Sequence, residues 1–207
     1  MNIIEAIKTR RSIRKFNQRV VPENLLREIV DAARWAPSGD NAQPWVFVII
    51  KDTQLKLKIQ SFLVDGAMRY IKSPKGKRVL KKYGQNMRLK WIKAIKSGTY
   101  QEHVSKAPVL IVVLGNTKSI YYVHDCCAAT QNLILAAHAL GLGSCWIDHG
   151  IDDELTESQI RNLLNVPNDY RIVSLISLGF PQEKPEPRPR KEIGEISFVN
   201  EYGKKWT

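Results

Sequence analysis

Five polar side chains crowd into residues 10–15, and their types suit the binding of a phosphate group. They are Arg10, Arg11, Ser12, Arg14 and Lys15. Planar guanidinium groups donate paired hydrogen bonds to phosphate oxygens, and a hydroxyl adds another. A solvated basic surface is the ordinary interpretation of such a run. However, Ile13 lies within this run and Phe16 directly follows it, both as apolar anchors, which favours a fixed backbone and hence a phosphate site.

A second candidate stretch is the segment APSGDNAQPW, residues 36–45. Proline, glycine, asparagine and aspartate mark a loop, because they fix φ, permit positive φ or bond their own backbone. Pro37 prevents the preceding helix from continuing, and Pro44 disfavours α conformation at Gln43. The result is a compact loop of backbone amides, a hydroxyl and carboxamides that could hold a planar polar ligand. An ordinary helix-to-strand connection is the alternative.

The spacing of apolar residues predicts the elements that position these two stretches. Residues 2–9 form a short helix whose inward face is Ile3, Ile4 and Ile7, and residues 22–35 form an amphipathic helix. Apolar runs predict buried strands at 45–50, 107–115, 145–147 and 171–179. Helices are predicted at about 119–140 and from Asp152 or Asp153 to about 165. The helix at 119–140 is apolar on nearly every side, which places it in a core or a subunit interface.

Length and composition predict one domain over residues 1–207. Hydrophobic residues make up 43% of the chain and charged residues 25%, as in globular proteins. No apolar run reaches membrane-spanning length, and the N-terminus lacks a signal-peptide pattern, so we expect a cytoplasmic protein that does not bind membranes. The cysteines Cys126, Cys127 and Cys145 form no CxxC or Cys/His cluster, so we expect structural thiols and no metal site.

The positive charge is concentrated in residues 51–106. This segment holds 15 Lys and Arg against 3 Asp and Glu, an excess equal to the +12 of the whole chain. Its patchy periodicity predicts short helices and loops that cover the core. The charge would attract anionic substrates or the extra phosphate of NADPH, or it could be a solvated surface. Nucleic-acid binding is a weaker alternative, because helix-turn-helix spacing and basic–aromatic interleaving are both missing.

Three motifs together resemble the nitroreductase family of flavoproteins. RRSIRKF is followed by a helix and by PSGDNAQPW, and GLGSCWI follows the central helix. The resemblance covers most of the chain and implies an α+β fold with a mixed β-sheet flanked by helices. It also implies a homodimer that binds FMN at the subunit interface. The sequence contains neither GxGxxG nor a P-loop motif.

The resemblance assigns expected roles to residues at the matching positions. The FMN phosphate and ribityl chain would contact Arg10, Arg11, Ser12 and Arg14 of one subunit. The loop that closes over the flavin of the other subunit would use Pro37, Ser38, Gly39 and Asn41. The isoalloxazine would be lined by Cys145, Trp146 and Ile147, and Arg190 of the arm at 181–207 would return to the phosphate. Asp148 and His149 stand where the family often has glycine, either as polar groups near the substrate or as an ordinary loop.

The expected activity is that of an FMN oxidoreductase with ping-pong kinetics. NADH or NADPH would give a hydride to FMN, and an electron-poor small molecule, such as a nitroaromatic or a quinone, would then be reduced. No catalytic side chain is expected, because the flavin carries the chemistry. The alternatives are a specialised flavin enzyme, such as a reductive dehalogenase or a metabolite dehydrogenase, and the nucleic-acid binder.

Overall fold

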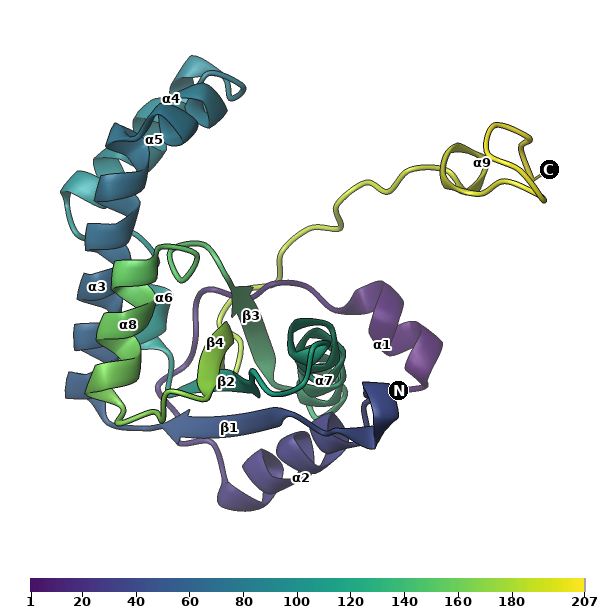
Figure 1. The fold of residues 1–207 in the computed structure, drawn as a ribbon, viewed down its shortest axis with the longest axis horizontal. Coiled ribbons are helices and arrows are strands. Elements are labelled where there is room, and N and C mark those ends of the chain that lie inside the picture. The colour runs from purple at the N-terminus through teal and green to yellow at the C-terminus, as the bar shows by residue number, and fades with distance from the viewer. Residues whose placement is uncertain (207) are drawn as a thin grey trace.

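The protein is built on one antiparallel β-sheet, seen in a computed structural model that describes residues 1–206 (Figure 1). Its strands are β1 (Trp45–Ile50), β2 (Val109–Asn116), β3 (Gly143–Ile147) and β4 (Tyr170–Gly179), in the order β1-β2-β4-β3. The prediction of a mixed sheet is therefore wrong, because all three strand pairs are antiparallel. The chain between β1 and β2 leaves and re-enters at the same end of the sheet, where Ile50 pairs with Leu110, so β2 runs opposite to β1.

Helices cover both faces of the sheet. α2 (Glu23–Arg34) and α7 (Tyr122–Ala139) lie on one face, and α3 (Thr53–Lys72) and α8 (Glu154–Leu163) lie on the other (Figure 1). Side chains alternate along a strand, so Ile111 of β2 joins the first core and Val112 joins the second. This double coverage explains why β2 is apolar along almost its whole length, and it confirms the predicted buried strand.

The central helix α7 is buried against the sheet and α2, as its apolar sequence predicted. Ala129, Leu133 and Ala137 are fully buried along its length. Gly141 follows the helix with φ of 78°, a left-handed conformation that glycine adopts without steric cost. None of the helices in the described part of the chain is long and apolar enough to cross a membrane.

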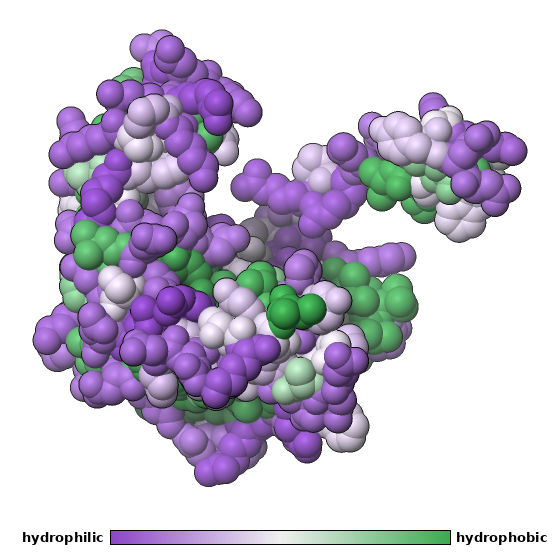
Figure 2. Space-filling view, in the orientation of Figure 1, coloured by the Kyte–Doolittle hydropathy of each residue, from purple (hydrophilic) through white to green (hydrophobic). Residues whose placement is uncertain are grey.

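The prediction for α1 (Ile3–Thr9) is correct for the helix but wrong for its inward face. Ile3, Ile4 and Ile7 are 62%, 57% and 51% exposed, and only Ala6 is buried. α1 packs beside the end of α7 through its small residue, which leaves the isoleucines uncovered in a single chain. Figure 2 shows the hydrophobic patch that they make.

Residues 51–106 contain a longer helix than the sequence predicted. α3 spans 20 residues and is followed by α4 (Pro74–Leu80), α5 (Gln85–Lys96) and α6 (His103–Lys106). α3 continues through Gly66, and a side chain at this position would collide with Thr156 of α8. Glycine is therefore needed for close packing of the two helices. α4 and α5 project away from the sheet as a hydrophilic hairpin (Figures 1 and 2).

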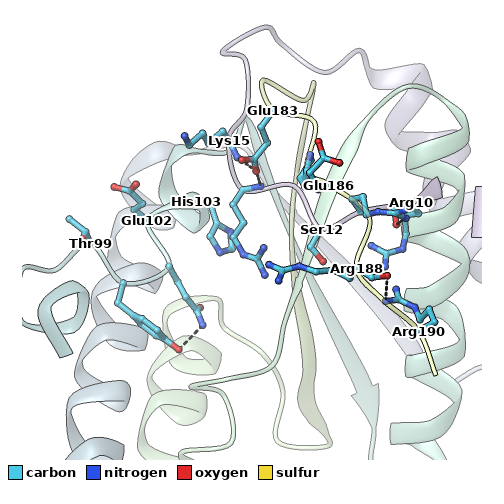
Figure 3. A pocket seen from close by; sticks show the side chains of 15 residues that line it. Arg10, Ser12, Lys15, Thr99, Glu102, His103, Glu183, Glu186, Arg188 and Arg190 are labelled. Atoms are coloured by element: carbon cyan, nitrogen blue, oxygen red, sulfur yellow. Dashed lines mark hydrogen bonds between the residues drawn. The ribbon is translucent and has the colours of Figure 1, made fainter. Parts of the chain in front are cut away.

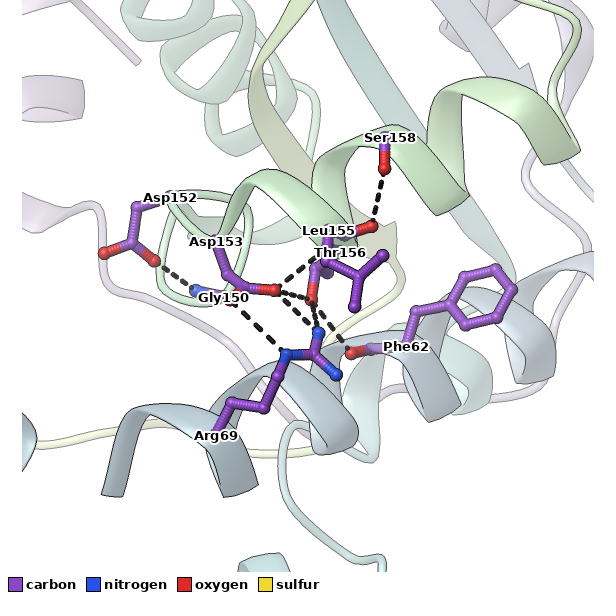
Figure 4. Close-up of polar contacts among 8 residues, drawn as sticks. All are labelled: Phe62, Arg69, Gly150, Asp152, Asp153, Leu155, Thr156 and Ser158. Atoms are coloured by element: carbon purple, nitrogen blue, oxygen red, sulfur yellow. Dashed lines mark hydrogen bonds and ion pairs between the residues drawn. The ribbon is translucent and has the colours of Figure 1, made fainter. Parts of the chain in front are cut away.

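The N-terminus of α8 is held by the carboxylate of Asp153 (Figure 4). This carboxylate accepts hydrogen bonds from the Thr156 amide at 2.9 Å and from the Arg69 guanidinium at 2.6 Å. The hydrogen bond from Arg69 is the main reason why the pKa of Asp153 falls from 3.8 to about 2. Asp153 therefore joins α8 to α3 as well as capping the helix, in agreement with the predicted cap.

We expect Asp153→Asn to lower the free energy of unfolding by about 1–2 kcal/mol at pH 7, because a charged hydrogen bond is lost. The lower part of the usual range applies because the Arg69 side chain is 39% exposed and solvent screens the pair. The folded-state pKa is below the unfolded value, so the stabilisation is present above pH 4 and is lost as the pH falls towards 2. Urea unfolding followed by circular dichroism should show the difference between wild type and variant shrinking over that range. Asp152→Asn is the control, and an equal loss in both variants would contradict the assignment.

The C-terminal arm leaves the sheet after β4. Residues 181–192 are extended, and the short helix α9 (Ile193–Ile196) lies far from the sheet (Figure 1). Phe198 and Lys205 form an isolated bridge within the arm. The first residues of the arm therefore lie beside the N-terminal segment, whereas α9 and the residues after it extend away from the rest of the chain (Figure 1).

Candidate functional site

A pocket of about 680 Å³ brings together three segments that are distant in the sequence (Figure 3). Its walls are residues 10–15, residues 99–103 and the arm residues 183–190. In Figure 3, Arg10 and Arg190 lie on one side, and Thr99 and Glu102 lie on the other. The pocket volume is in the range of ligand sites in proteins.

The basic segment is fixed to the sheet by its backbone and by two apolar anchors. Ile13 and Phe16 are 7% and 5% exposed, as predicted. The Ile13 amide donates to the Ser144 carbonyl at 2.9 Å, and Ser12 forms a parallel bridge with Ser144 of β3. A side chain at Gly143 would approach Ile13 within 2.8 Å, so glycine at this position permits the close contact.

The arm is attached to the same segment. The Gln182 amide donates to the Lys15 carbonyl at 2.9 Å, and the Asn17 amide donates to the Phe180 carbonyl at 2.8 Å. The Glu183 carboxylate accepts from the backbone amide of Lys15 at 3.0 Å. These bonds direct the arm across the pocket, so that residues near the two ends of the chain face one cavity.

The pocket carries an excess of positive charge. Its basic residues are Arg10, Arg11, Arg14, Lys15, Arg188 and Arg190, and its acidic residues are Glu102, Glu183 and Glu186. Burial lowers the pKa of Arg10, and the neighbouring charges of Arg11 and Arg190 lower it further. Within the described residues, the buried Nε of Arg11 has no hydrogen-bond partner. A dianionic group would relieve this repulsion and supply the missing acceptors.

His103 adds no charge to the pocket at neutral pH. Its Nδ1 lies 2.9 Å from the Ser177 hydroxyl, and burial lowers the pKa of His103 to about 4. The attraction for an anion therefore comes from the arginines and Lys15.

The structure brings together the predicted phosphate-site residues. Arg10, Arg11, Ser12 and Arg14 all line the pocket with Arg190. Arg188, the second arginine considered in the arm, also lines it. The proximity of these residues supports the predicted grouping.

The three predicted ring-lining residues lie on the neighbouring strand β3. The side chains of Cys145 and Ile147 are buried in the core between β3 and the helices α3 and α8, and Trp146 packs against the opposite core. They are not among the pocket-lining residues of the described chain. The loop after β3 approaches the pocket through His149, which contacts the pocket-lining Tyr100.

The loop at 36–45 is compact and strained. It contains the single turn η1 (Gly39–Asn41), and Asp40, Asn41 and Gln43 all have positive φ. Such conformations cost free energy in residues other than glycine and cluster at functional sites. The Gly39 amide donates to the buried carboxylate of Asp125 at 3.3 Å, which attaches the loop to the start of α7.

Within one chain, this loop and the arginine pocket lie at opposite ends of α7. The loop contacts Asp125, whereas Thr9, next to Arg10, contacts His138 at 2.9 Å. His138 lies thirteen positions after Asp125, a distance of about 20 Å along the helix. Pro37, Ser38, Gly39 and Asn41 therefore do not join the pocket of their own chain.

Sequence reasoning missed the residues on the far wall of the pocket. Tyr100 and Gln101 line it, and Tyr100 lies 2.7 Å from Nδ1 of His149 in the loop after β3. They occur in the basic segment without a motif, so only the polar pair Asp148-His149 hinted at this cluster. In the structure, Gln101 also has a positive φ of 51°, a backbone conformation that is unusual for glutamine.

Comparison with known proteins agrees with this geometry. The model of the nitroreductase family matches residues 7–180. A protein named putative NADH dehydrogenase/NAD(P)H nitroreductase from Methanothermobacter thermautotrophicus is 34% identical over 91% of this chain and 82% of its own length. The iodotyrosine deiodinase of Thermotoga neapolitana is 27% identical over 92% of this chain and 95% of its own length. The crystal structure of a nitroreductase with bound FMN from Bacteroides fragilis has a TM-score of 0.72 and 25% identity, and the match covers 96% of this chain and 99% of that one.

The α+β fold and the family match define the class of this protein. The chain belongs to the nitroreductase family and is a flavin oxidoreductase of that family.

Proposed function

We propose that this enzyme binds FMN in the arginine pocket and passes hydride from NADH or NADPH to an electron-poor acceptor of the nitroaromatic or quinone type. The observation that carries the proposal is the convergence of Arg10, Ser12 and Arg190 on one cavity. The structure of the Bacteroides fragilis relative holds FMN. The two half-reactions would share one site, which gives ping-pong kinetics.

The residues of the pocket fit the FMN phosphate. A phosphate dianion offers several acceptor oxygens to the unpartnered Arg11 Nε and to the guanidinium of Arg10. Ser12 would add a hydroxyl, and Arg14 and Arg190 would complete the site. FMN, when bound, supplies the hydride transfer, and the chain supplies binding, orientation and charge. This division explains why no metal or nucleophilic side chain is assigned.

In this proposal the backbone of β3 would face the flavin ring. Cys145, Trp146 and Ile147 keep their side chains in the cores, so their assigned role becomes a backbone one. The amides of the following loop, from Asp148 to Gly150, would then lie at the reactive edge of the ring. Backbone donors bind a polar ring edge without adding charge.

A homodimer would complete the site. In this proposal, Pro37, Ser38, Gly39 and Asn41 of one protomer close over the flavin bound mainly by its partner. The distance of about 20 Å along α7 supports this arrangement, since the loop does not reach the pocket of its own chain. Ile3 of α1 and Trp35, which is 73% exposed, border an apolar groove of about 420 Å³ that a second copy would cover, and the exposed Ile4 and Ile7 lie on the same helix.

The hairpin of α4 and α5 is proposed to act as a basic cover. Its lysines and arginines would raise the local concentration of anionic ligands, including the extra phosphate of NADPH. This field would speed the encounter with the nicotinamide and with anionic acceptors. It would weaken as salt is added.

Reductive dehalogenation is the second candidate. The matched relative from Thermotoga neapolitana is named iodotyrosine deiodinase, and the match covers 95% of that protein. The same flavin pocket could serve either activity, so the difference would lie in the acceptor. The residues around the open side of the pocket would decide it.

The proposal is tested by the colour and chemistry of the purified protein. We expect a yellow dimer that releases FMN on denaturation and is bleached by NADH or NADPH in the absence of oxygen. The bleached enzyme is then mixed with a nitroaromatic, a quinone or an iodophenol, and reoxidation is followed by absorbance. Reoxidation by the first two supports the proposed function, and fast reoxidation by the iodophenol alone supports the dehalogenase. A colourless protein that fails to bind added FMN would contradict both.

A further inference from the structure

Tyr100 and His149 form a polar contact between two cavities. Tyr100 lines the arginine pocket, whereas His149 lines a separate cavity of about 260 Å³ beside α3 and α4. The Tyr100 hydroxyl oxygen and Nδ1 of His149 are 2.7 Å apart. The two side chains therefore link the arginine pocket to the second cavity.

Gln101 fixes this pair in place. Its side-chain amide donates to the Tyr100 oxygen at 3.1 Å and to the backbone carbonyl of His149 at 3.1 Å. Gln101 does this from a left-handed conformation with φ of 51°, a strained state for glutamine. Such strain is typical of functional sites, where a side chain must be held in one orientation.

The surroundings keep both rings in position. The His149 ring packs edge-on against Tyr70, with 5.2 Å between the ring centroids, and it also contacts the rings of Trp91 and Tyr100. Burial raises the pKa of Tyr100 to about 12, so its hydroxyl keeps its proton at neutral pH. The charged groups that border the second cavity are Arg69, Lys75, Asp152 and Asp153.

The hydrogen-bond pattern leaves the Tyr100 proton free for a ligand in one histidine tautomer. The phenol oxygen can accept from Gln101 and from Nδ1–H of His149 at the same time. Its own hydrogen then has no acceptor among the described residues and can point into the arginine pocket. Nε2 of His149 is the nitrogen left to accept a proton from water in the second cavity.

We propose that Tyr100 donates a proton to the acceptor and that His149 resupplies it from the second cavity. This inference rests on the proposed function. An acceptor carbonyl that has gained a hydride carries a negative charge on oxygen and needs one proton. In that step the Tyr100 O–H bond breaks as the new O–H bond of the product forms, and the Nδ1–H proton of His149 moves to the Tyr100 oxygen. Nε2 takes a proton from water, and the hydroxide that remains is neutralised by bulk solvent. The electrons come from the reduced nicotinamide, and exchange with solvent restores the starting tautomer.

The test compares Tyr100→Phe with Tyr70→Phe in FMN-loaded enzyme. Tyr70 is the matched control, because its ring contacts His149 and loses a hydroxyl without removing the contact to Nδ1. We expect Tyr100→Phe to slow reoxidation by a quinone about a hundredfold, in the range for loss of a general acid. It should also lower the solvent deuterium isotope effect of this half-reaction, because the contribution of the Tyr100 proton is lost. Reduction by NADH or NADPH, which takes up no proton, should keep its rate in both variants.

A second measurement does not depend on turnover. Nitrogen NMR of the flavin-free protein should show a hydrogen on Nδ1 of His149, and its signal should shift in Tyr100→Phe but not in Tyr70→Phe. Wild-type reoxidation and an intact isotope effect in Tyr100→Phe would overturn the proposal, as would equal slowing of both half-reactions. A wild-type protein that never binds FMN would instead defeat the proposed function, so the two failures are distinguishable.

Discussion

Replacing Arg10 and Arg190 together by alanine should reduce FMN affinity by about a hundredfold to ten thousandfold. Each substitution removes charged hydrogen bonds worth about 1.5–3 kcal/mol, which corresponds to about ten- to hundredfold per residue. The two residues come from opposite ends of the chain and line one pocket, so the double variant tests their convergence. Fluorescence titration of FMN into the flavin-free protein measures the effect, because free and bound flavin differ in emission.

The control for this experiment is Arg27→Ala on α2. Arg27 is an exposed arginine outside the pocket, so its loss changes the net charge without removing a ligand. The single variants should each lose less affinity than the double variant. If Arg190→Ala binds FMN as tightly as the wild type, the arm does not contribute to the phosphate site, and Arg188 becomes the candidate.

The sequence predicted the anchored basic segment because the signals for it are local and chemical. Arginines with apolar anchors at Ile13 and Phe16 require a fixed basic segment, and the structure shows both anchors buried. The strands were found because a strand covered on two faces must be apolar throughout, as in β2. The cap at Asp153 was found because short polar side chains suit helix N-termini.

The errors arose where contacts with other parts of the protein decide the structure. The sequence predicts short helices in residues 51–106, but α3 continues through Gly66, whose close packing against Thr156 leaves no room for a side chain. Strand direction depends on where the long excursion over residues 51–106 returns, and no local pattern records this. The cluster of Tyr100, Gln101 and His149 joins residues almost 50 positions apart without a motif, so only the folded chain shows it.

The isoleucines of α1 also show that the local sequence does not determine which part of the protein covers an apolar face. Their spacing predicted a buried face, but nothing in one chain covers it. A periodic apolar pattern predicts that one face of a helix is buried, but it does not indicate whether the same chain or a second chain covers that face. The exposed pattern is therefore an indication of a partner, which the apolar groove beside Trp35 supports.

Replacing Ile4 and Ile7 by glutamate should convert the proposed dimer to monomers and lower FMN affinity by at least a hundredfold. Both side chains are more than half exposed in the single chain, so the substitutions should leave the fold of the monomer intact. A buried carboxylate without a partner is costly at an interface. FMN binding should fall with assembly, because the loop at 37–41 would no longer reach the flavin. Sedimentation, circular dichroism and FMN titration measure assembly, fold and binding separately.

Val20→Glu is the matched control, since Val20 is 84% exposed and lies outside α1. A well-folded monomer that binds FMN with wild-type affinity would show that one chain holds the whole site.

A mixing experiment tests directly whether the loop of one chain completes the pocket of the other. Arg10→Ala chains combined with chains that lack a functional 37–41 loop should form mixed dimers in which one of the two sites has both intact parts. Recovery of tight FMN binding in the mixture, absent from either parent, is expected only if the loop serves the partner's pocket.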